Sequence, residues 1–234
     1  DIDELELAPA ARHRPASLET ELEKSLARAR DETARRMFAA PYASLNLAAQ
    51  VGDAPAAVTE NRQRVGAALA LPGEPLWLQQ VHGTGIVDAD VDGTPGPADA
   101  ALTRRADRVL AILVADCMPV LFASEDGAVI AAAHAGWRGL AGGVLEVTVA
   151  AMDVEPRGLH AWLGPAIGSQ HFEVGAEVRE RFLAVDERAA AGFAANERGR
   201  WQCDLTLLAQ QRLAALGVVR ISAAARCTHD DAAH

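Results

Sequence analysis

The feature that most constrains the fold is a pair of apolar runs separated by a short turn signal. The first run, CMPVLFAS, begins at Cys117, and the second, AVIAAAHAGW, carries His134 near its end. The sequence SEDG between them ends in a glycine, which is typical of a tight turn between two antiparallel strands. The pattern therefore predicts that Cys117 and His134 lie on consecutive paired strands.

The rest of the chain alternates between helical and strand patterns. Helical spacing and end signals, including Asp204 as a cap and Gly217 as a stop, predict helices over residues 17–39, 56–71 and 204–217, near Gly139, and within GAEVRERFLAV. Apolar runs bounded by turn residues predict strands in PLWLQQVHG, RVLAILVADC, LHAWLGPAIG and VVRISAAARCT. The Asp-, Gly- and Pro-rich residues 87–100 are expected to form a long loop.

These elements favour one mixed α/β domain, because no internal repeat and no dividing linker occurs in the 234 residues. Aromatic residues make up only 4% of the chain, so the core is expected to consist mainly of Ala, Val and Leu.

Composition also excludes several classes of protein. A formal net charge of −10 argues against a general nucleic-acid-binding surface, which needs clustered Lys and Arg. No run of about 18 apolar residues is present, so a membrane span is not expected, and the acidic start DIDELELAPA lacks the order of a signal peptide. Three cysteines are too few for a disulfide scaffold, which favours a reducing, cytoplasmic location.

Three residues stand where an apolar strand gives way to Gly or Pro: His82 in QVHG, Cys117 in ADCMPV and His134 in HAGWRG. Two imidazoles and one thiolate suit Zn²⁺ with a fourth position left for water or substrate, as in catalytic zinc sites. Spacing alone does not bring the three together, because they lie far apart in the sequence. A buried Cys is also often only a small apolar side chain.

A second arrangement would use the same sulfur without a metal. Cys117 could act as a thiol nucleophile with His134 as its base and Asp116 or Asp99 as the acid. The two interpretations compete, since a thiolate bound to zinc is a poor free nucleophile. Nearby, Arg138 followed by glycines could hold an anion through its guanidinium and backbone N–H groups.

The motifs together closely resemble those of the laccase-domain family, also called the polyphenol oxidase or YfiH-type purine nucleoside phosphorylase family. They follow one another in the order SLNL (44–47), NR (61–62), QVHG (80–83), ADCMPV (115–120), HAGWRG (134–139), GPAIG (164–168) and FEVG (172–175). The pairing of ADCMPV with HAGWRG is highly specific. The resemblance covers about residues 41–228, so we expect a laccase-like domain over residues 41–234 and a separate N-terminal helical segment over residues 1–40.

The resemblance implies a single α/β (α+β) domain with mixed sheets in a β-sandwich-like core flanked by helices. It implies a catalytic zinc ion held by His82, Cys117 and His134. It also implies phosphorolysis of adenosine, inosine, guanosine and methylthioadenosine, together with deamination of adenosine.

For the substrates implied by the family, we expect Asn46 and Gln80 to hydrogen-bond the ribose or the base and Arg138 to attract phosphate. Three alternatives stay open: a copper-dependent polyphenol oxidoreductase, a Cys/His hydrolase acting in peptidoglycan precursor editing, and a nucleoside- or metal-binding module without turnover. One site of two His and one Cys is too small for the several coppers of a multicopper oxidase, which ranks the oxidase lower.

The sequence departs from the family pattern in two places. Relatives usually carry a TTRxGGVS-like segment before SLNL, whereas this chain has ARRMFAAPYA, with Arg35 and Arg36 as the nearby arginines. Relatives also usually continue past CT into an FFSYRR-like segment, which this sequence lacks. Both departures are expected to affect substrate affinity more than metal binding.

Overall fold

A computed structural model of the protein describes Tyr42 and residues 45–91, 96–224 and 226–230. The chain divides into two compact units, residues 1–72 and residues 73–234. The helix predicted over residues 17–39 and the domain boundary predicted near residue 40 lie outside the described residues.

The first unit contains a short 3-10 helix, η1 (Ala49–Val51), and the helix α2 (Pro55–Ala68), which confirms the helix predicted at 56–71. Helix α2 begins with a proline, whose missing N–H would have no partner at this position in any case. The buried Asn61 side chain donates a hydrogen bond to the carbonyl oxygen of Asn46 at 2.8 Å, so α2 holds the preceding loop in place.

The second unit is built on a six-stranded mixed sheet with the order β11-β7-β5-β6-β3-β2. Its central strands pair antiparallel, whereas β2 with β3 and β7 with β11 pair parallel. The strands in chain order are β2 (Ile86–Asp88), β3 (Ala100–Thr103), β5 (Met118–Ser124), β6 (Ile130–Ala135), β7 (Leu159–Leu163) and β11 (Arg220–Ala223).

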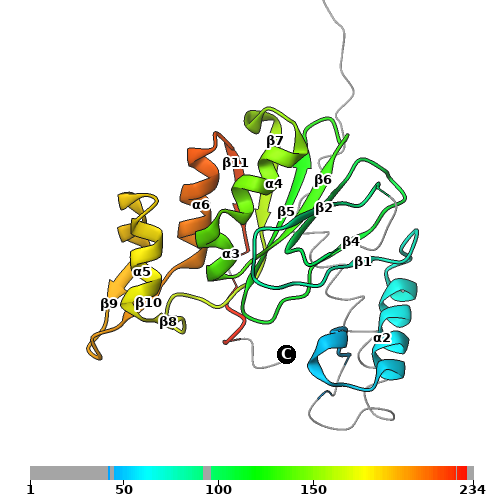
Figure 1. Cartoon of the computed structure of the whole chain (residues 1–234), viewed down its shortest axis with the longest axis horizontal. Helices are drawn as coiled ribbons and strands as arrows, with labels where there is room; N and C mark the ends of the chain where they lie inside the picture. Colours follow the sequence, from blue (N-terminus) through cyan, green and yellow to red (C-terminus); the bar gives the residue numbers. More distant parts are fainter. Residues whose placement is uncertain (1–41, 43–44, 92–95, 225, 231–234) are drawn as a thin grey trace, which may run out of the picture. The chain divides into compact units, whose positions relative to one another are not determined.

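Helices cover one face of this sheet. Helices α3 and α4 pack against β6, α4 also packs against β3 and α6, and α6 packs against β11 (Figure 1). The helical segments of the second unit are α3 (Trp137–Gly142), α4 (Val144–Met152), η2 (Pro156–Gly158), α5 (Ala176–Leu183), η3 (Glu187–Gly192) and α6 (Leu205–Ala215). As predicted, Asp204 caps α6 by accepting a hydrogen bond from the Leu207 N–H at 2.9 Å.

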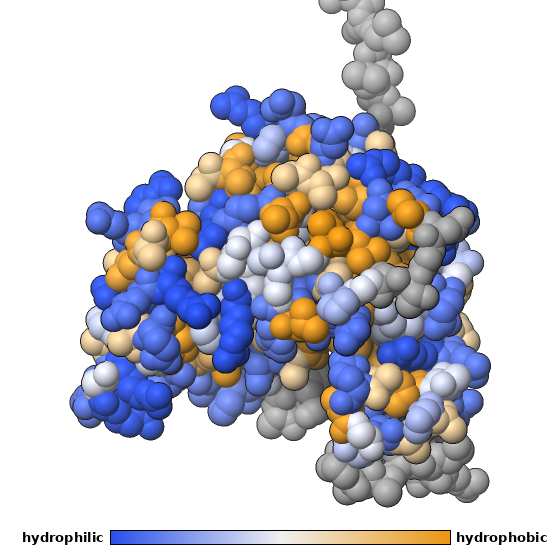
Figure 2. Space-filling model, in the orientation of Figure 1, coloured by the Kyte–Doolittle hydropathy of each residue, from blue (hydrophilic) through white to orange (hydrophobic). Residues whose placement is uncertain are grey.

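Two smaller sheets accompany the main one. A parallel pair is formed by β1 (Leu76–Trp77) and β4 (Leu110–Ala111), and an antiparallel sheet by β8 (Glu173–Val174), β10 (Trp201–Cys203) and β9 (Phe193–Ala195). The exposed turn between β9 and β10 forms the strongly hydrophilic corner at the lower left of Figure 2.

The core lies on both faces of the main sheet. Ala100 and Leu102 of β3 belong to the large core under the helices, while Ala101 between them joins a smaller cluster with Leu78 and Ala98. Small side chains on β6 let the helices approach the sheet closely, which confirms the expected Ala-, Val- and Leu-based core. The mixed α/β architecture with several sheets and flanking helices is confirmed.

The predicted hairpin is confirmed, but other predictions were only partly correct, including the strand predicted in PLWLQQVHG, of which only Leu76–Trp77 form β1. Strands β5 and β6 pair antiparallel with Pro119 opposite His134. In contrast, RVLAILVADC contributes only the two residues of β4, because Leu113 pairs with the side chain of Gln80 instead of a neighbouring strand. The loop predicted over residues 87–100 begins inside β2 and ends at the start of β3, a strand that the sequence did not reveal.

Among the described residues, no helix is both long enough and apolar enough to cross a membrane.

Candidate metal centre

The β5–β6 hairpin brings two of the three predicted ligands to the same end of the sheet. Cys117 immediately precedes β5, and His134 lies near the end of β6. His82 joins them from the loop after β1. One ligand atom from each of the three side chains lies within 4.8 Å of the others, and the two imidazole centroids are 4.8 Å apart with an angle of 74° between the rings.

Asp99 fixes the orientation of His134. Its Oδ1 lies 2.8 Å from Nδ1 of His134, and its backbone carbonyl accepts a hydrogen bond from the His134 N–H at 2.6 Å. A carboxylate only accepts hydrogen bonds, so Nδ1 carries the proton and Nε2 keeps its lone pair. In many metal sites, a carboxylate that does not itself bind the metal orients a metal-binding histidine in this way.

The same carboxylate also positions His82. The fully buried Asp99 accepts hydrogen bonds from the backbone N–H groups of Val81 (3.1 Å), His82 (2.9 Å) and Gly83 (2.6 Å). His82 has a φ of +59°, a left-handed conformation that costs roughly 1–2 kcal/mol for a residue with a Cβ. Three backbone hydrogen bonds to the Asp99 carboxylate offset that cost and fix the backbone position of His82.

Gly136 leaves the space that the cluster needs. A Cβ at this position would lie 2.6 Å from Sγ of Cys117 and 3.2 Å from Cδ2 of His82. A side chain here would therefore push the sulfur and the ring out of place.

The electrostatic surroundings of the three residues favour a cation. Burial, followed by the negative charges of Asp116 and Asp99, raises the pKa of the Cys117 thiol above its ordinary value. Burial also lowers the pKa of His134, whose side chain is almost fully inaccessible. The lowered pKa favours the neutral imidazole at pH 7, and a nearby cation would favour the thiolate of Cys117.

The donor set fits a zinc ion. Two neutral imidazoles and one thiolate are ligands that Zn²⁺ prefers, and three protein ligands leave one coordination position open. The cluster passes from the buried His134 to the exposed His82, so it opens to solvent on the His82 side.

Comparison with known proteins agrees with the motifs. The family described as "Multi-copper polyphenol oxidoreductase laccase" matches residues 32–234. This chain belongs to that family. The protein named purine nucleoside phosphorylase YfiH of Escherichia coli K12 is 48% identical over 194 residues, which cover 82% of this chain and 79% of the relative. A purine nucleoside phosphorylase of Streptomyces coelicolor is 38% identical over 203 residues, covering 84% of this chain and 83% of the relative.

Two solved structures share the fold. A Neisseria meningitidis protein of 43% identity superposes with a TM-score of 0.77 and covers 81% of this chain and 78% of its own. YlmD of Geobacillus stearothermophilus, at 28% identity, gives a TM-score of 0.74 and covers 83% of this chain and 79% of its own.

Arg138 lies on the exposed side of the family motif HAGWRG. Its guanidinium stacks 4.5 Å above the ring of Trp137, and its positive charge acts to lower the pKa of Cys117. A positive charge therefore lies near the cluster.

The other two predicted substrate-binding residues make structural hydrogen bonds. The side-chain amide of Gln80 donates a hydrogen bond to the carbonyl of Leu113 and accepts one from its N–H, both at 2.8 Å. These two bonds connect the His82 loop to the segment before Cys117. In the first unit, Asn46 donates to Ala48 O and to Asp53 Oδ2 and accepts from Ala48 N. Substrate contacts by Gln80 and Asn46 stay predictions.

Sequence reasoning missed two supporting residues. Asp99 entered only as an acid for a thiol nucleophile, and Gly136 was not singled out. A usable signal existed for Asp99, since a lone carboxylate between apolar residues in PADAALT indicates a buried group with a specific partner.

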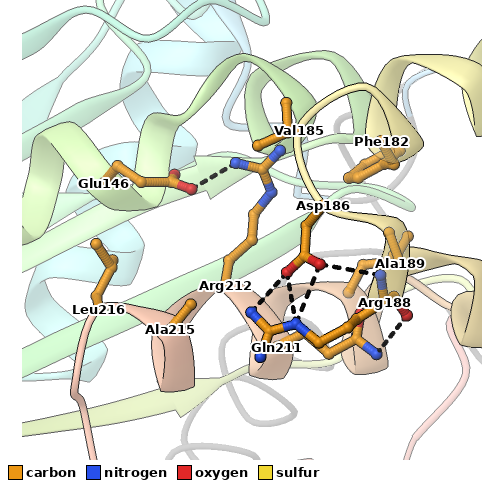
Figure 3. Close-up of a pocket in the computed structure, with 11 residues that line it drawn as sticks. Glu146, Phe182, Val185, Asp186, Arg188, Ala189, Gln211, Arg212, Ala215 and Leu216 are labelled. Carbon is orange, nitrogen blue, oxygen red and sulfur yellow. Dashed lines mark hydrogen bonds and ion pairs between the residues drawn. The ribbon is translucent and has the colours of Figure 1, made fainter.

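A cavity of about 440 Å³ lies elsewhere in the second unit, between α6, η3 and α4, and contains none of the three cluster residues (Figure 3). Its charged side chains form ion pairs with one another: Arg212 with Glu146, and Arg188 with Asp186 at 2.7 Å. Unlike the cluster, this cavity offers no set of side chains suited to a metal.

Proposed function

We propose that this protein is a zinc-dependent purine nucleoside phosphorylase. The observation that carries the proposal is the meeting of His82, Cys117 and His134 around one position, with Asp99 orienting His134 and the His82 loop. The names of the bacterial relatives support the reaction class.

The proposed substrates are adenosine, inosine, guanosine and methylthioadenosine. In phosphorolysis, inorganic phosphate forms a bond to C1′ of the sugar while the N-glycosidic bond breaks, which releases the free base and ribose 1-phosphate, or methylthioribose 1-phosphate from methylthioadenosine. We also propose adenosine deamination, in which water replaces the C6 amino group and ammonia leaves.

Each residue of the site would have a distinct role. His82, Cys117 and His134 would hold the ion, and Asp99 would keep the Nε2 lone pair of His134 directed at it. A bound zinc ion supplies Lewis acidity and lowers the pKa of water. Arg138 would attract phosphate through its exposed guanidinium, which suits phosphate geometry.

We further propose a cytoplasmic location, supported by three free cysteines, Cys117, Cys203 and Cys227. Such thiols persist in a reducing compartment.

A second candidate is a metal-free thiol hydrolase. It is supported by the arrangement in which Asp99 contacts His134 and His134 lies beside Cys117. Against it stands the raised pKa of Cys117, because a nucleophilic cysteine needs a lowered one. Copper is the alternative metal, supported by the description of the family.

The test is an assay of the purified protein with adenosine and phosphate after zinc loading and after chelation. We expect adenine and ribose 1-phosphate from the zinc-loaded protein, and inosine if deamination also occurs. Parallel incubations with copper and a phenolic substrate test the oxidase alternative.

His82→Ala is the diagnostic variant because it removes an exposed ligand, and His160→Ala is its matched control on the exposed side of β7. Activity should disappear with His82→Ala and persist with His160→Ala. Absence of every product from the zinc-loaded wild type would contradict the proposal, and turnover that survives chelation would favour the thiol hydrolase.

A further inference from the structure

A second group of metal-ligating side chains lies outside the site described above. One ligand atom from each of His171, Cys227 and Asp230 lies within 4.8 Å of the others. Nδ1 of His171 is 3.5 Å from Sγ of Cys227, and its Nε2 is 3.3 Å from Oδ1 of Asp230. We propose that these three residues, the second cluster, bind a second divalent ion of the zinc class.

The backbone around Cys227 fixes the position of its sulfur. The N–H of Gly168 donates a hydrogen bond to Sγ at 3.2 Å. A parallel bridge joins Ala166 to Cys227, and the N–H of Thr228 donates to the Ala166 carbonyl at 3.1 Å. Two loops distant in sequence are therefore fixed side by side, with the sulfur between them.

His171 is held from both its backbone and its ring. Its N–H donates to the carbonyl of Gly168 at 3.0 Å, within the same turn that approaches Cys227. Its ring stacks on that of His229 with centroids 4.0 Å apart and an interplanar angle of 14°. The imidazole therefore has a defined orientation beside the sulfur and the carboxylate.

The donor chemistry selects the ion. Sulfur, imidazole nitrogen and carboxylate oxygen are the three ligand types of protein zinc sites. A thiolate and a carboxylate together carry two negative charges, which a divalent cation neutralises. Cys227 is half-buried while His171 and Asp230 are exposed, so an ion can enter from solvent and water can complete its coordination.

The second cluster is connected to the first through Asp116, the residue before Cys117. The Asp116 carboxylate accepts a hydrogen bond from Thr228 Oγ1 at 2.8 Å, and its carbonyl accepts one from the Ile167 N–H at 2.9 Å. An ion that joins the two loops at the second cluster would also stabilise the position of Cys117.

The experiment measures metal content of the full chain by elemental analysis after zinc loading and dialysis. The wild type should retain about two zinc ions per chain, and His171→Ala or Asp230→Asn about one, since each removes a ligand of a three-ligand site. His82→Ala should also retain about one, and His82→Ala combined with His171→Ala should retain none.

His171 and Asp230 are exposed, so replacing them should leave the core intact. These two variants therefore test the proposal even if Cys227→Ser folds poorly. His160→Ala is the control and should keep the wild-type zinc content. Cobalt substitution in the His82→Ala background supplies a second readout, because a thiolate–cobalt charge-transfer band that disappears with Cys227→Ser assigns the ion to the second cluster. A zinc content that is the same in wild type, His171→Ala and Asp230→Asn would overturn the proposal.

Discussion

The Oδ1 atom of Asp99 lies 2.8 Å from Nδ1 of His134, and both side chains are buried. The carboxylate of Asp99 at the same time accepts three backbone hydrogen bonds from the loop that carries His82. One side chain thus sets the positions of two ligands that are 52 residues apart (134 − 82). The geometry of the cluster depends on Asp99 although Asp99 does not belong to it.

Replacing Asp99 with Asn should weaken zinc binding by about 10- to 100-fold, the usual cost of removing a residue that orients a metal ligand. The amide keeps the size of the side chain but presents an N–H₂ group to partners that are themselves donors. Chelator competition measures the affinity. Asp107→Asn, at an exposed surface ion pair, is the control and should leave zinc binding unchanged.

Replacing Gly136 with Ala should reduce zinc affinity by about tenfold or more, because a contact of 2.6 Å between the new Cβ and Cys117 Sγ forces about 1–3 kcal/mol of rearrangement. The secondary structure, followed by circular dichroism, should remain. Gly66→Ala in α2 is the matched control, since its Cβ meets no atom within 4 Å. Equal zinc affinities in the two variants would show that Gly136 is not needed for space.

Alkylation of Cys117 should be slow in the metal-free protein at neutral pH. Burial and two neighbouring carboxylates raise the pKa of its thiol above 9.0, so the thiolate fraction grows about tenfold for each pH unit up to that raised pKa. Zinc should protect the residue. Peptide mass spectrometry after iodoacetamide treatment measures the rate separately for each cysteine.

Cys203 is the internal reference for this measurement, because burial raises its pKa to about 12 and its side chain is inaccessible in the folded protein. Rapid alkylation of Cys117 near neutral pH without metal would instead support a thiolate activated by His134, as the hydrolase hypothesis requires.

The local part of the site could be predicted from sequence. Two apolar runs around SEDG define a hairpin, so Cys117, directly before β5, and His134, near the end of β6, were placed correctly at the same end of two paired strands. The helix that starts at Leu205 followed in the same way from its cap at Asp204.

The non-local part could not be predicted from spacing alone. His82 reaches the cluster because its backbone adopts a left-handed conformation that three hydrogen bonds to Asp99 stabilise, and no pattern near residue 82 encodes that contact. The residue types made a three-ligand site one of two interpretations, and the resemblance to the laccase-domain family is what favoured it. The second cluster was missed for the same reason, since His171 and Cys227 meet through a bridge between two loops.

The metal-free protein should lose stability as the pH falls below about 6.5, and His134 should account for part of the loss. Burial lowers the pKa of its imidazole in the folded state, so below 6.5 the unfolded chain binds a proton that the folded chain does not. Stability then falls with decreasing pH, by at most about 1.4 kcal/mol per pH unit for one proton, until the lowered pKa is reached. Above 6.5 this residue adds no pH dependence.

Urea unfolding of chelated wild type and His134→Gln at about pH 7.5 and about pH 5.5 measures the effect, since the free energy of unfolding is obtained at each pH. The glutamine variant cannot titrate, so its loss of stability between the two pH values should be smaller than that of the wild type. His160→Ala removes an exposed histidine and should match the wild type. Identical losses in wild type and His134→Gln would mean that burial does not lower the pKa of His134 in the folded protein.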